Sequence, residues 1–260
     1  IDLISRYIPR ETQADRIDAL MKAQANCFAV GLTTIVDAGL GVNTINLIDS
    51  LNQAGDLKMR LYVMVTPTSE SLDYFKTRGK IKTDFLNVRS FKVYGDGALG
   101  SRGANLIADY SDDPGNSGFL LERPDVYNEL AKTLFEMGFQ MNTHAIGDST
   151  NKTILNIYAK YLPEGNDLRW KIEHSQIVSL EDVDKFGKYN IVPSVQPTHA
   201  TSDMYWAKDR LGEPRVKTAY TFKDLLDQNG YIALGSDFPV ENINPMYGFH
   251  SAVARQDNNN

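Results

Sequence analysis

Phe139-Gln-Met-Asn-Thr143 opens the stretch of sequence that decides the fold. This run is expected to be a strand, residues 151–161 a helix, and Arg169-Trp-Lys-Ile-Glu173 a second strand. A helix between two strands is typical of a crossover unit, in which the two strands lie parallel in one sheet.

The same alternation runs along the whole chain. Strands are expected at residues 31–36, 59–65, 87–94, 139–143, 169–173, 190–195 and 231–234. Helices are expected at residues 12–28, 43–53, 124–137, 151–161, 179–186 and 221–228, the fifth with a capping-box spacing at Ser179 and Asp182. Seven strands that alternate with helices predict an α/β fold of the (β/α)8 barrel type with about seven of its eight units. A doubly wound sheet is the competing fold, but no Gly-x-Gly-x-x-Gly opens a helix after the first strand.

Two polar segments interrupt this pattern. Residues 98–123 and part of 198–220 are rich in Gly, Ser and Asp, and each segment follows the end of a strand. Such segments are expected to be long loops on the active-site face of a barrel, not linkers between domains. The prediction is therefore one partial barrel domain over residues 1–260.

Composition excludes several classes of protein. The net charge is −6 and the pI about 5.3, and no basic run is present, so a nucleic-acid-binding surface is not expected. No run approaches the ~18 apolar residues of a membrane span. The single cysteine, Cys27, rules out an internal disulfide and favours the cytoplasm. Any native targeting signal would lie upstream of residue 1.

Residues capable of chemistry stand at the ends of the expected strands. His144, His174 and Asp237 close three of these strands, Lys92 lies near the end of another, and His199 follows a fifth. The C-terminal strand ends of a barrel converge on one mouth, so these side chains are expected to meet there.

The strand that carries Lys92 has a regular alternation. Phe91 and Val93 share one face and would pack under the helices. The other face carries Ser90, Lys92, Tyr94 and Asp96. A lysine that points into a barrel needs a function, because an unpaired buried ammonium group is costly.

Each of these residues also has a purely structural interpretation. A strand-end histidine is often a hydrogen-bonded structural residue, Asp237 before Phe-Pro suits a turn or a helix N-cap, and Lys92 could pair with Asp96. Asp96-Gly-Ala-Leu-Gly100 lacks the Lys-Ser/Thr of a phosphate-binding loop. Four such groups at the ends of different strands nevertheless indicate a common site.

Five ordered motifs carry a resemblance to a known family. They are Phe91-Lys-Val-Tyr-Gly-Asp-Gly-Ala-Leu-Gly-Ser-Arg-Gly-Ala104, Asn142-Thr-His-Ala-Ile-Gly-Asp148, Lys171-Ile-Glu-His-Ser-Gln176, Ser194-Val-Gln-Pro-Thr-His199 and Leu234-Gly-Ser-Asp-Phe-Pro-Val240. The chain resembles the amidohydrolase superfamily over about residues 10 to 255, and its YtcJ-like branch, which includes N-substituted formamide deformylases, in particular.

The resemblance implies a role for each residue. Lys92 matches a lysine that becomes carboxylated and bridges two metals, and His144 and His174 match metal-ligating histidines. Asp237 matches an aspartate that binds metal and moves a proton. One or two divalent ions, usually zinc, would activate water to attack an amide-type small molecule. His199, Arg102 and Tyr94 are further candidates for substrate binding or oxyanion stabilisation, although Arg102 could instead form a loop salt bridge.

One feature departs from the family pattern. The first strand of the family ends in His-x-His, but no histidine precedes His144 in this chain, and residues 31–39 resemble the second strand. The first strand and the small β-sandwich of full-length relatives are therefore expected to be absent. Truncation is the favoured explanation over a degenerate relative, because the other four metal positions are intact, and it predicts weak or no activity in this chain and hydrolase activity in the parent protein. A barrel that lacks one strand exposes two sheet edges, which favours partial folding or pairing with a second copy in a homo-oligomer.

Two other functions compete with a metal-dependent hydrolase. The barrel could be a non-catalytic module that binds a small ligand or a partner, with structural histidines. It could also be a metal-free enzyme that uses His199 with Asp203, although no Gly-x-Ser-x-Gly nucleophile motif is present.

Overall fold

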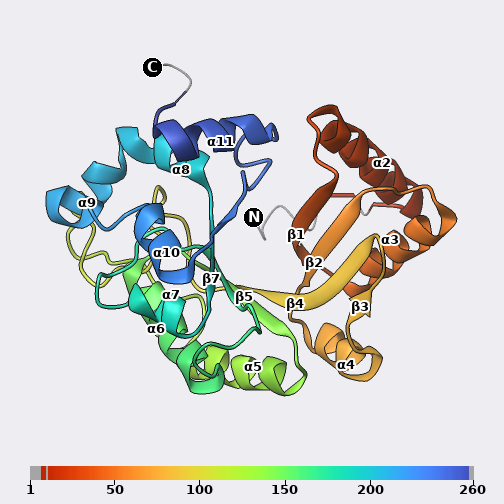
Figure 1. The fold of residues 1–260 in the computed structure, drawn as a ribbon, viewed down its shortest axis with the longest axis horizontal. Coiled ribbons are helices and arrows are strands. Elements are labelled where there is room, and N and C mark those ends of the chain that lie inside the picture. Colours follow the sequence, from red (N-terminus) through yellow and green to blue (C-terminus); the bar gives the residue numbers. More distant parts are fainter. Residues whose placement is uncertain (1–6, 10, 258–260) are drawn as a thin grey trace.

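The computed structural model describes residues 7–9 and 11–257, which form a curled sheet covered by helices (Figure 1). Hydrogen-bonded neighbours follow the order β1-β2-β4-β5-β6-β7-β8, all in parallel pairs, and the short β3 pairs antiparallel with β4. The strands are β1 (Thr34–Leu40), β2 (Arg60–Val65), β3 (Ile81–Lys82), β4 (Leu86–Tyr94), β5 (Gln140–Ala145), β6 (Lys171–His174), β7 (Val192–Val195) and β8 (Ala233–Leu234). The seven expected parallel strands are all confirmed, whereas β3 was not predicted.

Helices connect the strands. They are α2 (Gln13–Ala29), α3 (Val42–Ala54), α4 (Ser69–Arg78), α5 (Pro124–Glu136), α6 (Asp148–Tyr161), α7 (Asp184–Lys188), α8 (Pro197–Ser202), the 3-10 turn η1 (Asp203–Tyr205), α9 (Ala207–Val216), α10 (Phe222–Asn229) and α11 (Pro245–Ala254). The helix expected at residues 179–186 is shorter than predicted and starts at Asp184. The capping box predicted there is wrong, because the carboxylate of Asp182 binds Lys185 Nζ at 2.5 Å and the carbonyl of Ser179 accepts the Asp182 amide.

The main hydrophobic core lies between the outer face of the sheet and the helices. Alternate residues of β2 and β4 enter it, as does the Phe75 ring of α4. The rings of Phe75, Phe91 and Phe139 contact one another edge to face with centroid separations of 5.3 to 6.1 Å. Phe91 and Val93 therefore pack under the helices, as the alternation predicted.

β4 contains one residue more than its pairing with β2 requires. While β2 advances by one residue, β4 advances from Val88 to Ser90, which leaves Arg89 without a partner. On the N-terminal side of Arg89 the even-numbered residues pack into the outer core, and on its C-terminal side the odd-numbered residues do. An extra residue of this kind changes which side chains point to each face, and here it directs Lys92 to the inner face.

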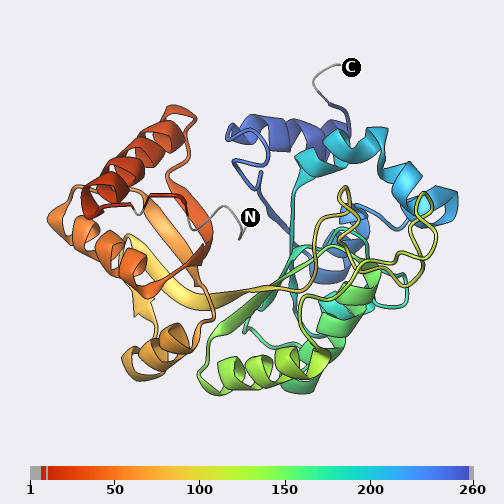
Figure 2. The same cartoon turned by 180° about the vertical axis from the view of Figure 1, so that it is seen from behind.

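The barrel is incomplete, as predicted. β1 and β8 lie at the two ends of the sheet and do not pair with each other within the described residues. Figures 1 and 2 show α2 and α3 on one side of this opening and α8 and α11 on the other.

Among residues 7–9 and 11–257, none of the helices has the length and apolar character needed to cross a bilayer.

Two strand-to-helix segments pack together beside the mouth of the barrel. Residues 98–123 remain a loop, as expected, whereas residues 197–216 contain α8, η1 and α9. A second apolar cluster joins the two segments and includes Leu99, Tyr110 and Leu211. The 98–123 loop is therefore packed against the 197–216 segment through its apolar side chains.

Candidate functional site

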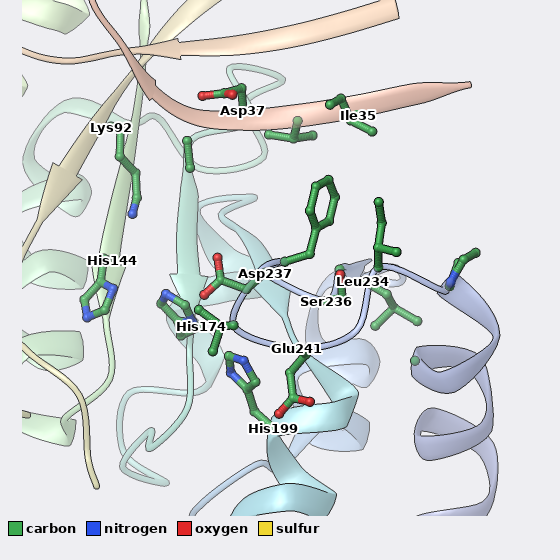
Figure 3. A pocket seen from close by; sticks show the side chains of 18 of the residues that line it. Ile35, Asp37, Lys92, His144, His174, His199, Leu234, Ser236, Asp237 and Glu241 are labelled. Carbon is green, nitrogen blue, oxygen red and sulfur yellow. The ribbon is translucent and has the colours of Figure 1, made fainter. Parts of the chain in front are cut away.

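One large cavity opens at the C-terminal ends of the parallel strands, with a volume of about 1100 Å³ (Figure 3). Six of the seven predicted site residues line it: Lys92, Tyr94, His144, His174, His199 and Asp237. Strand geometry explains the convergence, because parallel strands of a curled sheet end on the same side. We call this space the mouth cavity.

Arg102 is the predicted residue that the structure places elsewhere. It is not among the residues that line the mouth cavity. Its guanidinium donates to Asp112, with Nε at 3.2 Å and Nη2 at 2.9 Å from the two carboxylate oxygens. Arg210 of α9 binds the same carboxylate, so Arg102 takes part in joining the 98–123 loop to α9. This arrangement favours the salt-bridge interpretation.

Three imidazole rings lie in a row along the mouth cavity. The His144 and His174 rings have centroids 4.4 Å apart in an edge-to-face contact, and the His174 and His199 rings are stacked with centroids 6.1 Å apart. Burial, with the nearby His174 and Lys92, lowers the pKa of His144 to about 2. Burial also lowers the pKa of His174, although Asp237 acts in the opposite direction. Both rings are therefore neutral near pH 7, which is the form that binds metals.

Each of the two buried rings has one nitrogen next to a side-chain oxygen. The Oε1 atom of Gln196 lies 2.7 Å from His174 Nδ1, within hydrogen-bonding distance. The Oδ1 atom of Asp96 lies 3.4 Å from His144 Nε2, and that nitrogen is buried without a regular hydrogen bond. His144 thus directs its Nε2 atom, and His174 its Nδ1 atom, to a neighbouring side chain and not to the cavity.

His174 reaches the cavity through an irregular backbone. In a regular strand His174 would share the face of Ile172, which is part of the outer core. His174 instead has φ of 76° and the next residue, Ser175, has φ of 43°. Non-glycine residues in this left-handed region are uncommon and concentrate at functional sites.

Lys92 is the buried cation of the mouth cavity. It is 4% exposed and has no hydrogen bond or ion pair with any residue of the described part of the chain. Its Nζ lies 4.0 Å from the centroid of the Tyr94 ring. Burial lowers the pKa of Lys92, while Glu173 and Asp237 act in the opposite direction. The pairing with Asp96 that the sequence left open does not form.

Asp237 and three unpredicted residues are further members of the cavity lining. Asp237 follows β8, has φ of 56° and directs its carboxylate towards the His174 side of the cavity (Figure 3). Asp37, Trp206 and Glu241 also line the cavity and were not singled out from sequence. Asp37 had a detectable signal, since it stands near the end of an expected strand, whereas Trp206 and Glu241 lie in segments without strand or helix periodicity.

The donor chemistry fits a metal only in part. Neutral imidazoles, a carboxylate and a buried lysine are suitable precursors of a zinc-type site. However, residues 7–9 and 11–257 contain no group of three or more His, Cys, Asp or Glu side chains arranged to hold one ion. The described residues therefore supply a pair of adjacent imidazoles with further donors nearby, not a closed metal site.

The lowered pKa of His144 predicts an acid-sensitive fold in the metal-free chain. The imidazole pKa is 6.5 in the unfolded chain and about 2 in the folded one, so below pH 6.5 the unfolded chain binds the proton first. Stability is present above pH 6.5 and falls as the pH drops towards 2, by on the order of 2 kcal/mol between pH 7 and 5. Urea denaturation of the wild type and of His144→Asn at both pH values would measure this difference. The variant should show the smaller loss, and His250→Asn, which changes an exposed histidine, should behave like the wild type.

Comparison with known proteins agrees with this geometry. The sequence model of the amidohydrolase family, Amidohydro_3, matches residues 2–260. The chain belongs to the amidohydrolase family. It is 30% identical to the putative amidohydrolase YtcJ of Bacillus subtilis, over 98% of this chain and 49% of that protein, and is YtcJ-like. It is also 30% identical to the protein LONG AFTER FAR-RED 3 of Arabidopsis thaliana, over 98% of this chain and 46% of that protein.

A solved structure resembles this amidohydrolase-family chain over nearly its whole length. It is the crystal structure of an uncharacterized metal-dependent hydrolase from Pyrococcus horikoshii, with a TM-score of 0.87 and 28% identity. The match covers 98% of this chain and 51% of that structure. The chain thus spans about half the length of the curated relatives it matches.

Proposed function

We propose that the protein containing this chain is a metal-dependent hydrolase of C–N bonds in amide-type small molecules. The observation that carries this proposal is the convergence of Lys92, His144, His174 and Asp237 on one cavity from the ends of four strands. The family membership and the metal-dependent hydrolase of similar structure support it.

The proposed metal is zinc, because imidazole and carboxylate donors suit it. His144, His174 and Asp237 would hold it, and Lys92 would join them as an oxygen ligand once carboxylated. A bound ion would supply hydroxide near neutral pH and polarise the scissile carbonyl. Asp237 would take the proton of the attacking water and deliver it to the leaving nitrogen. His199 and Tyr94 line the cavity beside these groups and are proposed to contact the substrate.

We further propose that this chain alone is weak or inactive as a hydrolase. Its described residues do not gather three carboxylate, imidazole or thiolate donors at one point. The open edges of β1 and β8 also leave the cavity without a wall on that side. We infer that hydrolase activity needs further metal donors and a closed wall beyond those that the described residues supply.

Metal analysis of the complete parent protein tests the proposed function. The purified protein should retain zinc after dialysis, and His144→Ala or His174→Ala should lose it because each change removes a buried imidazole. A chelator should abolish hydrolysis of a panel of N-substituted amides, and added zinc should restore it. Asn190→Ala is a matched control distant from the cavity lining and should keep its metal. Absence of bound metal in the complete protein, or hydrolysis that resists the chelator, would contradict the proposal.

A further inference from the structure

Asp96 is a buried carboxylate that has no role in the proposed chemistry. It is 1% exposed and lies two residues beyond β4. Its Oδ1 accepts the Ile146 amide at 3.0 Å, and its Oδ2 accepts the amides of Gly147 at 2.8 Å and Asn105 at 2.9 Å. No Lys or Arg of the described residues pairs with it, and burial raises its pKa to about 6 despite these amides. A buried charge without a cationic partner is costly, so a specific use is expected.

The three amides come from two segments that meet at Asp96. Asn105 belongs to the 98–123 loop, and Ile146 and Gly147 form the turn between β5 and α6, directly after His144 and Ala145. The segments lie so close that a Cβ atom on Gly147 would be 2.0 Å from the Asn105 carbonyl oxygen. Asp96 therefore sits where β4, the loop and the turn behind His144 come together.

The same carboxylate also lies beside the ring of His144. Its Oδ1 is 3.4 Å from Nε2, which is fully buried, whereas the His144 side chain as a whole is 13% exposed. Nε2 has no regular hydrogen bond within the described residues, and the Gly97 backbone also interacts with the His144 ring, where it acts to raise the pKa. Gln196 has the corresponding position at His174, but at Nδ1 instead of Nε2.

We propose that Asp96 is a positioning residue that sets the orientation and tautomer of His144. Its Oδ1 keeps the proton on Nε2, so Nδ1 presents its lone pair to the mouth cavity, and its amide contacts fix the turn that follows the ring. A hydrogen-bond acceptor at one imidazole nitrogen decides which tautomer is present and which nitrogen can bind a ligand. Asp96 has this role in the metal-free chain, whether or not the proposed hydrolase function is correct.

Asp96→Asn makes a prediction with a definite direction. Two backbone amides point at the position of Oδ2 and one at that of Oδ1. The amide oxygen of asparagine should therefore occupy the Oδ2 position, which places its NH2 group against His144 Nε2. A donor at that place requires Nε2 to be an acceptor, so the proton of the ring should move to Nδ1.

Asp148 offers a matched control. It also anchors the 98–123 loop, since its Oδ1 accepts the Ile107 amide at 2.8 Å and the Ser149 amide at 2.9 Å. Within residues 7–9 and 11–257, its carboxylate contacts backbone amides and not the His144 ring. Asp148→Asn should weaken the loop without changing the tautomer, and this separates a role at the ring from a purely structural one.

The experiment is long-range ¹H–¹⁵N NMR on metal-free, ¹⁵N-histidine-labelled chain at a pH above the ordinary histidine pKa of about 6.5. The His144 signals are identified by their loss in His144→Gln. We expect the proton on Nε2 in the wild type and in Asp148→Asn, and on Nδ1 in Asp96→Asn. The proposal is overturned if the wild type carries the proton on Nδ1, if Asp96→Asn leaves it on Nε2, or if Asp148→Asn moves it equally. Should Asp96→Asn fail to fold, Asp96→Ser replaces it: loss of the fixed proton on Nε2 is then expected, and an unchanged Nε2 proton overturns the proposal.

Discussion

Replacement of Asp237 with asparagine in the complete protein is expected to lower kcat by about 10²- to 10⁴-fold, the usual contribution of a positioned acid–base group. Asparagine keeps the size and one oxygen of the side chain but cannot take up a proton. Asp237 is exposed and follows the two-residue strand β8, so the change should not unfold the protein. Steady-state kinetics on an amide substrate would measure kcat, and thermal denaturation would verify the fold.

Asp227→Asn is the control for this experiment. Asp227 lies on the exposed side of α10, where it pairs with Lys223, and is not part of the mouth cavity. It should retain the wild-type kcat. If Asp237→Asn also retained wild-type kcat with its metal bound, the aspartate would not be the proton carrier.

Phe91→Ala is expected to reduce the free energy of unfolding by roughly 3–5 kcal/mol, the range for truncation of a buried aromatic side chain. Phe91 is 0% exposed and its ring contacts those of Phe75 and Phe139. Alanine would leave a cavity between β4, β5 and α4 that the two remaining rings cannot fill without moving. Chemical denaturation followed by circular dichroism would give the change.

Phe119→Ala provides the comparison, because Phe119 is 60% exposed in the 98–123 loop. Its effect should stay within about 0.5 kcal/mol. An equal loss in both variants would show that the outer core does not dominate the stability of this chain.

The regular parts of the fold could be predicted because their patterns are local. Strand runs and helices with several apolar positions gave the seven parallel strands and most of the helices. α4 lacked such a signal, since only Leu72, Phe75 and the flanking Tyr74 are apolar along its ten residues. α9 contains Gly212 and Pro214, and Gly212 has non-helical torsion angles, so no periodicity indicated a helix there.

The candidate site was predictable to the extent that barrel topology alone brings strand ends together. That rule was sufficient to place His144, His174 and Lys92 at one cavity. It could not reveal the contacts of Asp96, whose amide partners at residues 146 and 147 are 50 and 51 positions away. Nor could it decide the role of Arg102, because its partner Asp112 lies in a loop without periodicity. Such contacts depend on how irregular segments pack, which spacing does not encode.

Arg89 of β4 has no partner in β2, so even-numbered residues before it and odd-numbered residues after it face the outer core. What directs Lys92 inward is the number of peptide units between Val88 and Lys92, not the chemical identity of any one of them. A substitution at position 89 would thus leave the direction of the Lys92 side chain unchanged. Deletion of one residue there would instead turn the Lys92 amine from the cavity into the outer hydrophobic core beneath the helices. The number of residues in β4, as much as their chemical types, therefore decides which face of the sheet Lys92 occupies.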